Sequence, residues 1–171
     1  MGILRAPLFD RASKRKIMKV VVDSDVLIKL TKTGSKEVIV SLLDVSIPKR
    51  VYEETVTESK GCIDANKIQH NIDVGMIQVQ GQSTRDKGEF EALKLYRSGG
   101  FELIVSDDRK FLNYLDRSGI PYLTSSSLIV YLLYKNKISK EDTIKYIDNL
   151  KTHISKKQYL TAMSEVQKWE K

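Results

Sequence analysis

Two short stretches share one pattern: VVVDSD at residues 20–25 and LIVSDD at residues 103–108. In each, three apolar residues are followed by carboxylates. Short apolar runs rich in β-branched residues are typical of buried strands in a parallel sheet. Open α/β sheets bind ligands beyond the carboxyl ends of their strands. The two stretches therefore predict one acidic pocket at one edge of a sheet, where the carboxylates repel one another unless a cation lies among them.

The overall composition is that of an ordinary globular domain. The chain has 171 residues, of which 41% are hydrophobic and 30% charged, enough for one domain with its own core. No apolar stretch approaches the roughly 20 residues that cross a bilayer, and residues 1–17 lack the apolar segment of a secretory signal. The single Cys62 excludes an intramolecular disulfide and fits a reducing compartment. We therefore expect a cytoplasmic protein with no membrane partner.

The net charge of +7 is concentrated at the two ends of the chain. Residues 1–19 and 135–171 carry a surplus of Lys and Arg, whereas residues 20–134 are slightly acidic. Basic ends would hold a polyanion close to an acidic, cation-filled pocket. Lysines also solvate helices without binding anything, so the charge alone does not decide between these two interpretations.

The hydrophobic pattern alternates between strand-like and helix-like segments. Strands are expected at 19–22, 45–47, 76–80, 103–105 and 121–123. Helices are expected at 26–32, 36–43, 51–57, 89–97, 109–117, 126–135, 140–151 and 156–170, with 60–71 weakly helical or loop. This order predicts the α/β class, as a three-layer α/β/α sandwich around a mainly parallel sheet of four or five strands. Residues 18–135 would form the main domain, 1–17 a basic leader or arm, and 136–171 a C-terminal helical extension packed on the same domain.

Six carboxylates stand at predicted strand ends or in the first turns of predicted helices: Asp23, Asp25, Glu54, Glu89, Asp107 and Asp108. Oxygen ligands without His or Cys suit hard cations such as Mg²⁺ or Mn²⁺. Such ions activate water and stabilise the oxygens of an in-line phosphoryl displacement. The pattern therefore indicates metal-dependent phosphoryl chemistry that needs no Ser, Cys or His nucleophile.

Each of these acids also has a structural interpretation. Asp25 would cap the following helix, Glu54 would lie on a solvated helix surface beside Glu53, and Glu89 would favour a positive helix N-terminus. One of Asp107 and Asp108 would be a cap and the other a ligand.

Three residues close to the late strand are candidate substrate-binding residues. Ser106 would orient the late aspartate or the scissile phosphate, and Arg109 and Lys110 would contact phosphate or lie in solvent.

Five motifs in order resemble the PIN domain: VVDSDVLI at 21–28, PKRVYEE at 48–54, GEFEALKL at 88–95, LIVSDDRKF at 103–111 and GIP at 119–121. The resemblance covers nearly all of residues 18–135. The tail, with ISKED at 138–142 and ISKKQY at 154–159, resembles a subgroup of prokaryotic PIN proteins that have extra C-terminal helices.

The resemblance implies a metal-dependent nuclease, because PIN domains are often ribonucleases and many are VapC-like toxins of toxin–antitoxin pairs. The family's acidic quartet falls on Asp23, Glu54, Glu89 and Asp108. Asp25 departs from the Ser, Thr or Asn often found there and is a candidate fifth ligand, and Asp107 is the other candidate for the late acid placed on Asp108. The implied cofactor is Mg or Mn, the implied substrate RNA, and the implied partners an antitoxin protein and a second copy of the chain in a homodimer.

Two alternatives remain at this point. Haloacid-dehalogenase-like phosphatases also have a strand ending in Asp-x-Asp, whose first Asp attacks phosphorus, but Val26-Leu27 stands where Gly-Thr usually follows. The other alternative is a non-catalytic PIN-like module that binds RNA or protein. Such a module is expected to lack acids of the quartet, and this chain has all four.

Overall fold

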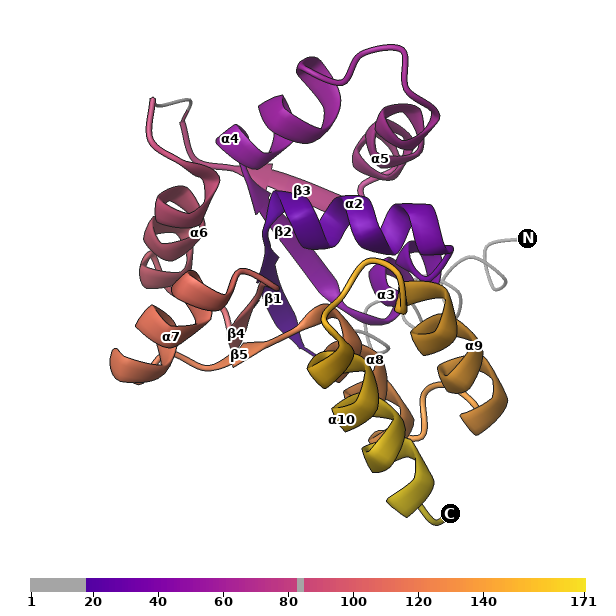
Figure 1. The fold of residues 1–171 in the computed structure, drawn as a ribbon. Coiled ribbons are helices and arrows are strands. Elements are labelled where there is room, and N and C mark those ends of the chain that lie inside the picture. The colour runs from indigo at the N-terminus through magenta and orange to yellow at the C-terminus, as the bar shows by residue number, and fades with distance from the viewer. Residues whose placement is uncertain (1–17, 83–84) are drawn as a thin grey trace, which may run out of the picture.

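The computed structural model describes residues 18–82 and 85–171 (Figure 1). The strands β1 (Lys19–Val22), β2 (Asp44–Pro48), β3 (Ile77–Gln80), β4 (Leu103–Val105) and β5 (Tyr122–Leu123) form one sheet in the order β3-β2-β1-β4-β5. All neighbouring pairs run parallel. Strands β1 and β4 are direct neighbours, with Val20 opposite Leu103 and Val22 opposite Val105. The predicted fold class and the predicted pairing of the two acid-terminated stretches are therefore confirmed.

Alternation along β1 separates the two faces of the sheet. Val20 and Val22 belong to the larger core cluster, whereas Val21 belongs to a smaller one, because successive side chains of a strand point to opposite faces. The smaller cluster is covered by α6 (Gly88–Arg97) and α7 (Arg109–Arg117). Figure 1 shows these two helices together on one side of the sheet.

The larger cluster lies under the remaining helices. It includes residues of α2 (Ser24–Thr33), α8 (Ser125–Tyr134), α9 (Lys140–Leu150) and α10 (Lys156–Lys168). The C-terminal helices therefore share one continuous core with the sheet, and Figure 1 shows them grouped beside α2.

The segment after β2 differs from its predicted form. A single helix was expected at 51–57, but α4 (Lys49–Tyr52) begins directly after Pro48 and continues as a π-helical segment, η1 (Glu53–Thr57). Proline fits the position before a first helical turn because its φ is already fixed near the helical value. π-Helical turns are often found at functional sites, and this one carries Glu54.

The region expected to be weakly helical forms a regular helix, α5 (Ile63–Asp73). It packs through Ile68, which is fully buried in the large core cluster. A polar contact joins it to α3 (Lys36–Leu42): Lys36, a residue only 2% exposed, donates to the Asn71 side-chain oxygen and to the Lys67 carbonyl, and its ammonium also pairs with Glu37. Tertiary packing thus stabilises a helix whose own sequence pattern is weak.

The leader expected at residues 1–17 lies outside the described residues. Within the part of the chain that the structure describes, no helix is both long enough and apolar enough to cross a bilayer.

Candidate active site

Asp23 is the first acid of the site and is fixed by its position directly after β1. Its Oδ1 accepts a hydrogen bond from the Val26 N–H at 2.9 Å, so that it caps α2. Its own N–H donates to the Val105 carbonyl at 3.2 Å. The residue is only 5% exposed. The end of β1, the start of α2 and the end of β4 therefore meet at this carboxylate.

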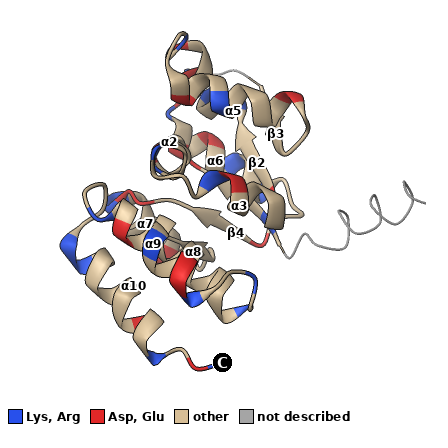
Figure 2. Ribbon diagram, turned by 90° about the vertical axis from the view of Figure 1, so that its right-hand side faces the viewer, with Lys and Arg blue, Asp and Glu red and all other residues tan. Residues whose placement is uncertain are grey.

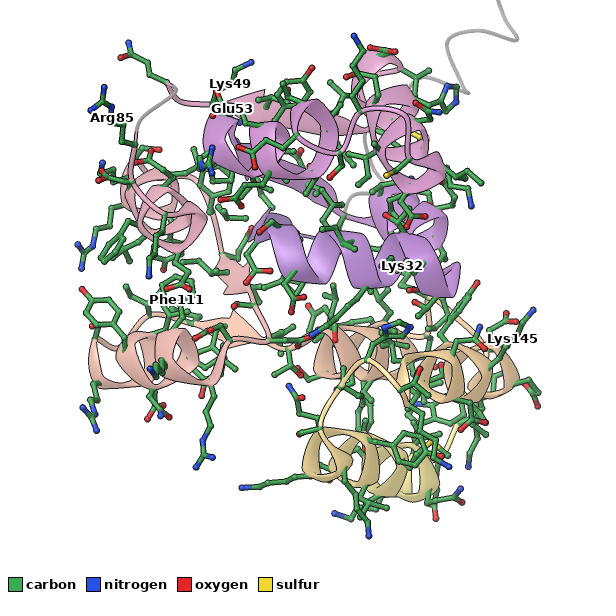
Figure 3. All side chains as sticks on the ribbon, turned by 45° about the horizontal axis from the view of Figure 1, so that its top comes forward. Lys32, Lys49, Glu53, Arg85, Phe111 and Lys145 are labelled. Carbon is green, nitrogen blue, oxygen red and sulfur yellow. The ribbon has the colours of Figure 1, made fainter. Side chains whose placement is uncertain are left out.

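Asp108 stands at the equivalent place after β4. It caps α7, with Oδ1 accepting from the Phe111 N–H at 2.8 Å. Phe111 packs in the cluster between α7 and α6 (Figure 3). The completely buried Ser106 lies between the two acids: its hydroxyl accepts from the Asp108 N–H at 3.2 Å and donates to Asp23. Ser106 was predicted to bind substrate or orient the late aspartate, and the structure places it beneath the acids.

Glu54 and Glu89 approach from the other side of the site. Glu89 lies in the first turn of α6, and Glu54 lies in η1. The two elements pack closely, because a Cβ added at Gly88 would lie 3.1 Å from Glu54 Oε2. Arg50 Nε holds Glu54 Oε1 at 3.1 Å. Glu54, which the resemblance to the PIN domain favoured, lines the site, and its neighbour Glu53 does not.

A pocket of about 450 Å³ is lined by the four acids Asp23, Glu54, Glu89 and Asp108. Its lining contains all six predicted metal ligands together with Arg109, and it adds Ser24, Lys87 and Gly88. Lys110 is not among the lining residues, but its charge reaches Glu89, where it opposes the rise in pKa that burial causes. A second pocket, of about 500 Å³, lies at the start of α9, and among the described residues that line it Glu141 is the only acid. The acids predicted from separate motifs are therefore brought together at one edge of the sheet.

The electrostatics of the pocket disfavour so many free carboxylates. Burial raises the pKa of Asp23 to about 7, although hydrogen bonds from Ser106 and Val26 oppose the rise, and the charges of Asp107 and Asp25 add to it. Burial and the charge of Asp108 also raise the pKa of Glu89. Both pKa values are raised because the charged forms of Asp23 and Glu89 are unfavourable in the folded protein when no cation is bound.

Two of the six acids are engaged by a lysine that sequence reasoning missed. Lys29 Nζ lies 2.6 Å from Asp25 Oδ2 and 3.1 Å from Asp107 Oδ2. Asp107 also accepts from the Ser125 N–H at 2.8 Å, the Ser125 hydroxyl at 2.7 Å and the Gln158 side chain at 3.5 Å. The i, i+4 spacing of Asp25 and Lys29 on a helix was the available signal for their ion pair.

The donor set suits a hard divalent cation, since every candidate ligand is a carboxylate oxygen. Within residues 18–82 and 85–171, no three acid, His or Cys side chains already stand where they would hold one ion. Coordination would therefore require side chains such as the exposed Asp108 and the half-buried Glu54 and Glu89 to turn toward a shared ion.

Comparison with known protein families gives one result. A family model described as DUF3368: PIN domain matches residues 19–168. This span includes every strand of the sheet, all six acids and the C-terminal helices, so the chain belongs to the PIN-domain family. A comparison with curated proteins finds no match.

Proposed function

We propose that this PIN-domain protein is a metal-dependent endoribonuclease that hydrolyses phosphodiester bonds in RNA. The observation that carries the proposal is the convergence of Asp23, Glu54, Glu89 and Asp108 on one pocket. PIN domains are typically nucleases, and this chain has an acid at all four positions of the family's quartet. Family membership gives the phosphatase alternative no support.

In this proposal the four acids would together hold Mg²⁺ or Mn²⁺. A bound ion would lower the pKa of water and offset the charge of the phosphodiester. The chain itself supplies the orientation: Ser106 holds Asp23 from below, and the helix-capping bonds fix one oxygen each of Asp23 and Asp108. Lys87 and Arg109 line the same pocket and would contact phosphate oxygens.

A polyanionic substrate is supported by the surroundings of the pocket. Gln158 reaches Asp107 from the first turn of α10, so the exposed Lys156 and Lys157 that precede it stand close to the acids. Figure 2 shows basic positions where the chain enters α10. Such lysines bind phosphates without reading base sequence. We therefore expect cleavage to weaken as salt rises, since phosphate binding releases counterions.

The test is cleavage of a mixed RNA pool by the purified protein with Mn²⁺, with EDTA, and with a DNA pool of matched length. We expect cutting of RNA that EDTA abolishes. Asp23→Asn should remove cutting and retain RNA binding, because loss of one negative charge does not weaken attraction to a polyanion. Asp142→Asn, at an exposed position in the first turn of α9, is the matched control and should cut at the wild-type rate.

Two outcomes would contradict the proposal. A wild-type protein that binds RNA but leaves it uncut with Mn²⁺ would be a binding module. An Asp23→Asn variant that cuts at the wild-type rate would exclude the pocket as the catalytic site.

The finer proposal is that the nuclease is the toxin of a toxin–antitoxin pair and forms a homodimer. Expression of the chain should then arrest growth, and co-expression of a protein that binds it should restore growth. Light scattering should give twice the chain mass. Growth unaffected by an RNA-cleaving protein would exclude the toxin role while leaving the nuclease activity in place.

A further inference from the structure

Lys29 is not itself among the residues that line the pocket, but it is bound to two of the aspartates that are. It lies in the second turn of α2, the helix capped by Asp23, and its ammonium contacts Asp25 and Asp107 at 2.6 and 3.1 Å. Its side chain is 15% exposed and that of Asp107 is 2% exposed. The ammonium is therefore a fixed part of the site rather than a mobile surface charge.

The bonds of Asp107 leave it little capacity for a metal ion. A carboxylate has about four lone-pair positions, and Asp107 accepts from Lys29, from the backbone and hydroxyl of Ser125, and from Gln158. Ser125 is completely buried. If Asp107 turned toward an ion, the N–H and hydroxyl of Ser125 would lose these bonds and remain buried without an acceptor, which costs free energy.

Asp25 has the same partner and a different environment. Its side chain is 61% exposed, and its contact with Lys29 spans one helical turn. Lys29 therefore forms ion pairs with two carboxylates at once, and its charge would repel a divalent cation placed there.

We propose that Lys29 is a positioning residue that acts as a built-in cation: it holds Asp25 and Asp107, so that the pocket binds one divalent ion, through the other four acids. The inference rests on the proposed function only in taking that ion to be Mg²⁺ or Mn²⁺. It assigns the two adjacent aspartates different roles, with Asp108 facing the ion and Asp107 anchoring Lys29 to α8 and α10.

The experiment counts Mn²⁺ ions by isothermal titration calorimetry and by the loss of the free-Mn²⁺ electron paramagnetic resonance signal. The proteins are wild type, Lys29→Met, Lys29→Arg and Lys32→Met. Lys32 is an exposed lysine on the same helix (Figure 3), so Lys32→Met removes the same charge outside the pocket. We expect one ion in wild type, Lys29→Arg and Lys32→Met, and a second ion in Lys29→Met.

A second pair of variants keeps the proposal testable if Lys29→Met fails to fold. Asp108→Asn should weaken Mn²⁺ binding at least tenfold, and Asp107→Asn less than threefold. Two ions in wild type, one ion in a folded Lys29→Met, or the reverse order of the two aspartate variants would each overturn the proposal.

The same data separate this inference from the proposed function. One bound ion with uncut RNA would count against the nuclease and leave the role of Lys29 standing. Two ions in a wild-type protein that cuts RNA would contradict the role of Lys29 and leave the nuclease proposal standing. If neither wild type nor Lys29→Met binds Mn²⁺, both proposals are wrong.

Discussion

The backbone N–H of Asp23 donates to the carbonyl of Val105, so the first acid of the pocket is bonded directly to the strand that leads to Asp107 and Asp108. This bond continues the β1–β4 ladder one residue beyond the pair Val22 and Val105. The separation of the two aspartate-bearing segments is thus set by strand register, which is strongly specified in a buried sheet. The carboxylates are brought together by folding itself.

The metal-free protein should lose stability as pH rises from about 4 to about 7. Burial raises the pKa of Asp23 from 3.8 to about 7 in the folded state, so the folded state binds more protons than the unfolded state across that interval. The contribution is fully present below pH 3.8 and is lost as pH passes the folded pKa, at up to about 1.4 kcal/mol per pH unit. Urea unfolding in EDTA at several pH values measures it.

The control for that slope is Asp23→Asn, since Asn also caps helices well. The variant should become more stable relative to wild type as pH rises. Parallel curves for the two proteins would show that Asp23 carries no such penalty.

Ser106→Ala should change the pKa of Asp23 as well as lower the free energy of unfolding. The substitution removes the hydroxyl that lies between Asp23 and the Asp108 N–H, at a cost of about 1–3 kcal/mol in the free energy of unfolding. It should also raise the pKa of Asp23 further, because the Ser106 bond lowers it. Carboxyl titration by NMR measures that shift. Ser41→Ala, at an exposed hydroxyl, is the matched control; equal effects of the two variants would contradict the prediction.

Gly88→Ala should displace Glu54 without unfolding the protein. The added Cβ would meet Glu54 Oε2 at 3.1 Å, and the tip of that flexible side chain can move aside. Mn²⁺ affinity should fall several-fold while stability changes by less than about 1 kcal/mol. A double-mutant cycle with Glu54→Gln tests whether Gly88→Ala acts through Glu54. If it does, Gly88→Ala should lower Mn²⁺ affinity little further in the Glu54→Gln background. Full additivity would show that Gly88 acts independently of Glu54.

Asn71→Ala should destabilise the fold by about 1–3 kcal/mol, because it removes one of the acceptors of the buried Lys36 ammonium, which keeps its bonds to Glu37 and to the Lys67 carbonyl. Chemical unfolding measures the loss, and Asn66→Ala, at an exposed position on the same helix, is the control. The double variant Lys36→Met with Asn71→Leu should lose less than the sum of its single changes. A loss below about 0.5 kcal/mol for Asn71→Ala would show that Glu37 and the Lys67 carbonyl satisfy the lysine without Asn71.

The sequence predicted those features that a local pattern encodes. Three valines before Asp23 and the LIV run before Ser106 identified β1 and β4, and acids after strands identified the pocket. Lys29 and Asp107 are 78 positions apart, and Lys36 and Asn71 are 35 apart. Such pairs are made by tertiary packing, and no local periodicity marks them. The π-helical turn at Glu53–Thr57 was missed for a related reason, since helical periodicity does not distinguish one wide turn.

The position of Gln158 determines how much of the C-terminal region a functional fragment of this protein must include. Its side-chain oxygen accepts from the Ser155 N–H at the start of α10, while its nitrogen reaches Asp107, so one amide both begins the last helix and borders the pocket. A fragment trimmed at residue 135 would keep all six acids yet lose this amide, together with the buried contacts of α9 and α10. The smallest piece of the chain worth purifying for biochemistry therefore extends through α10.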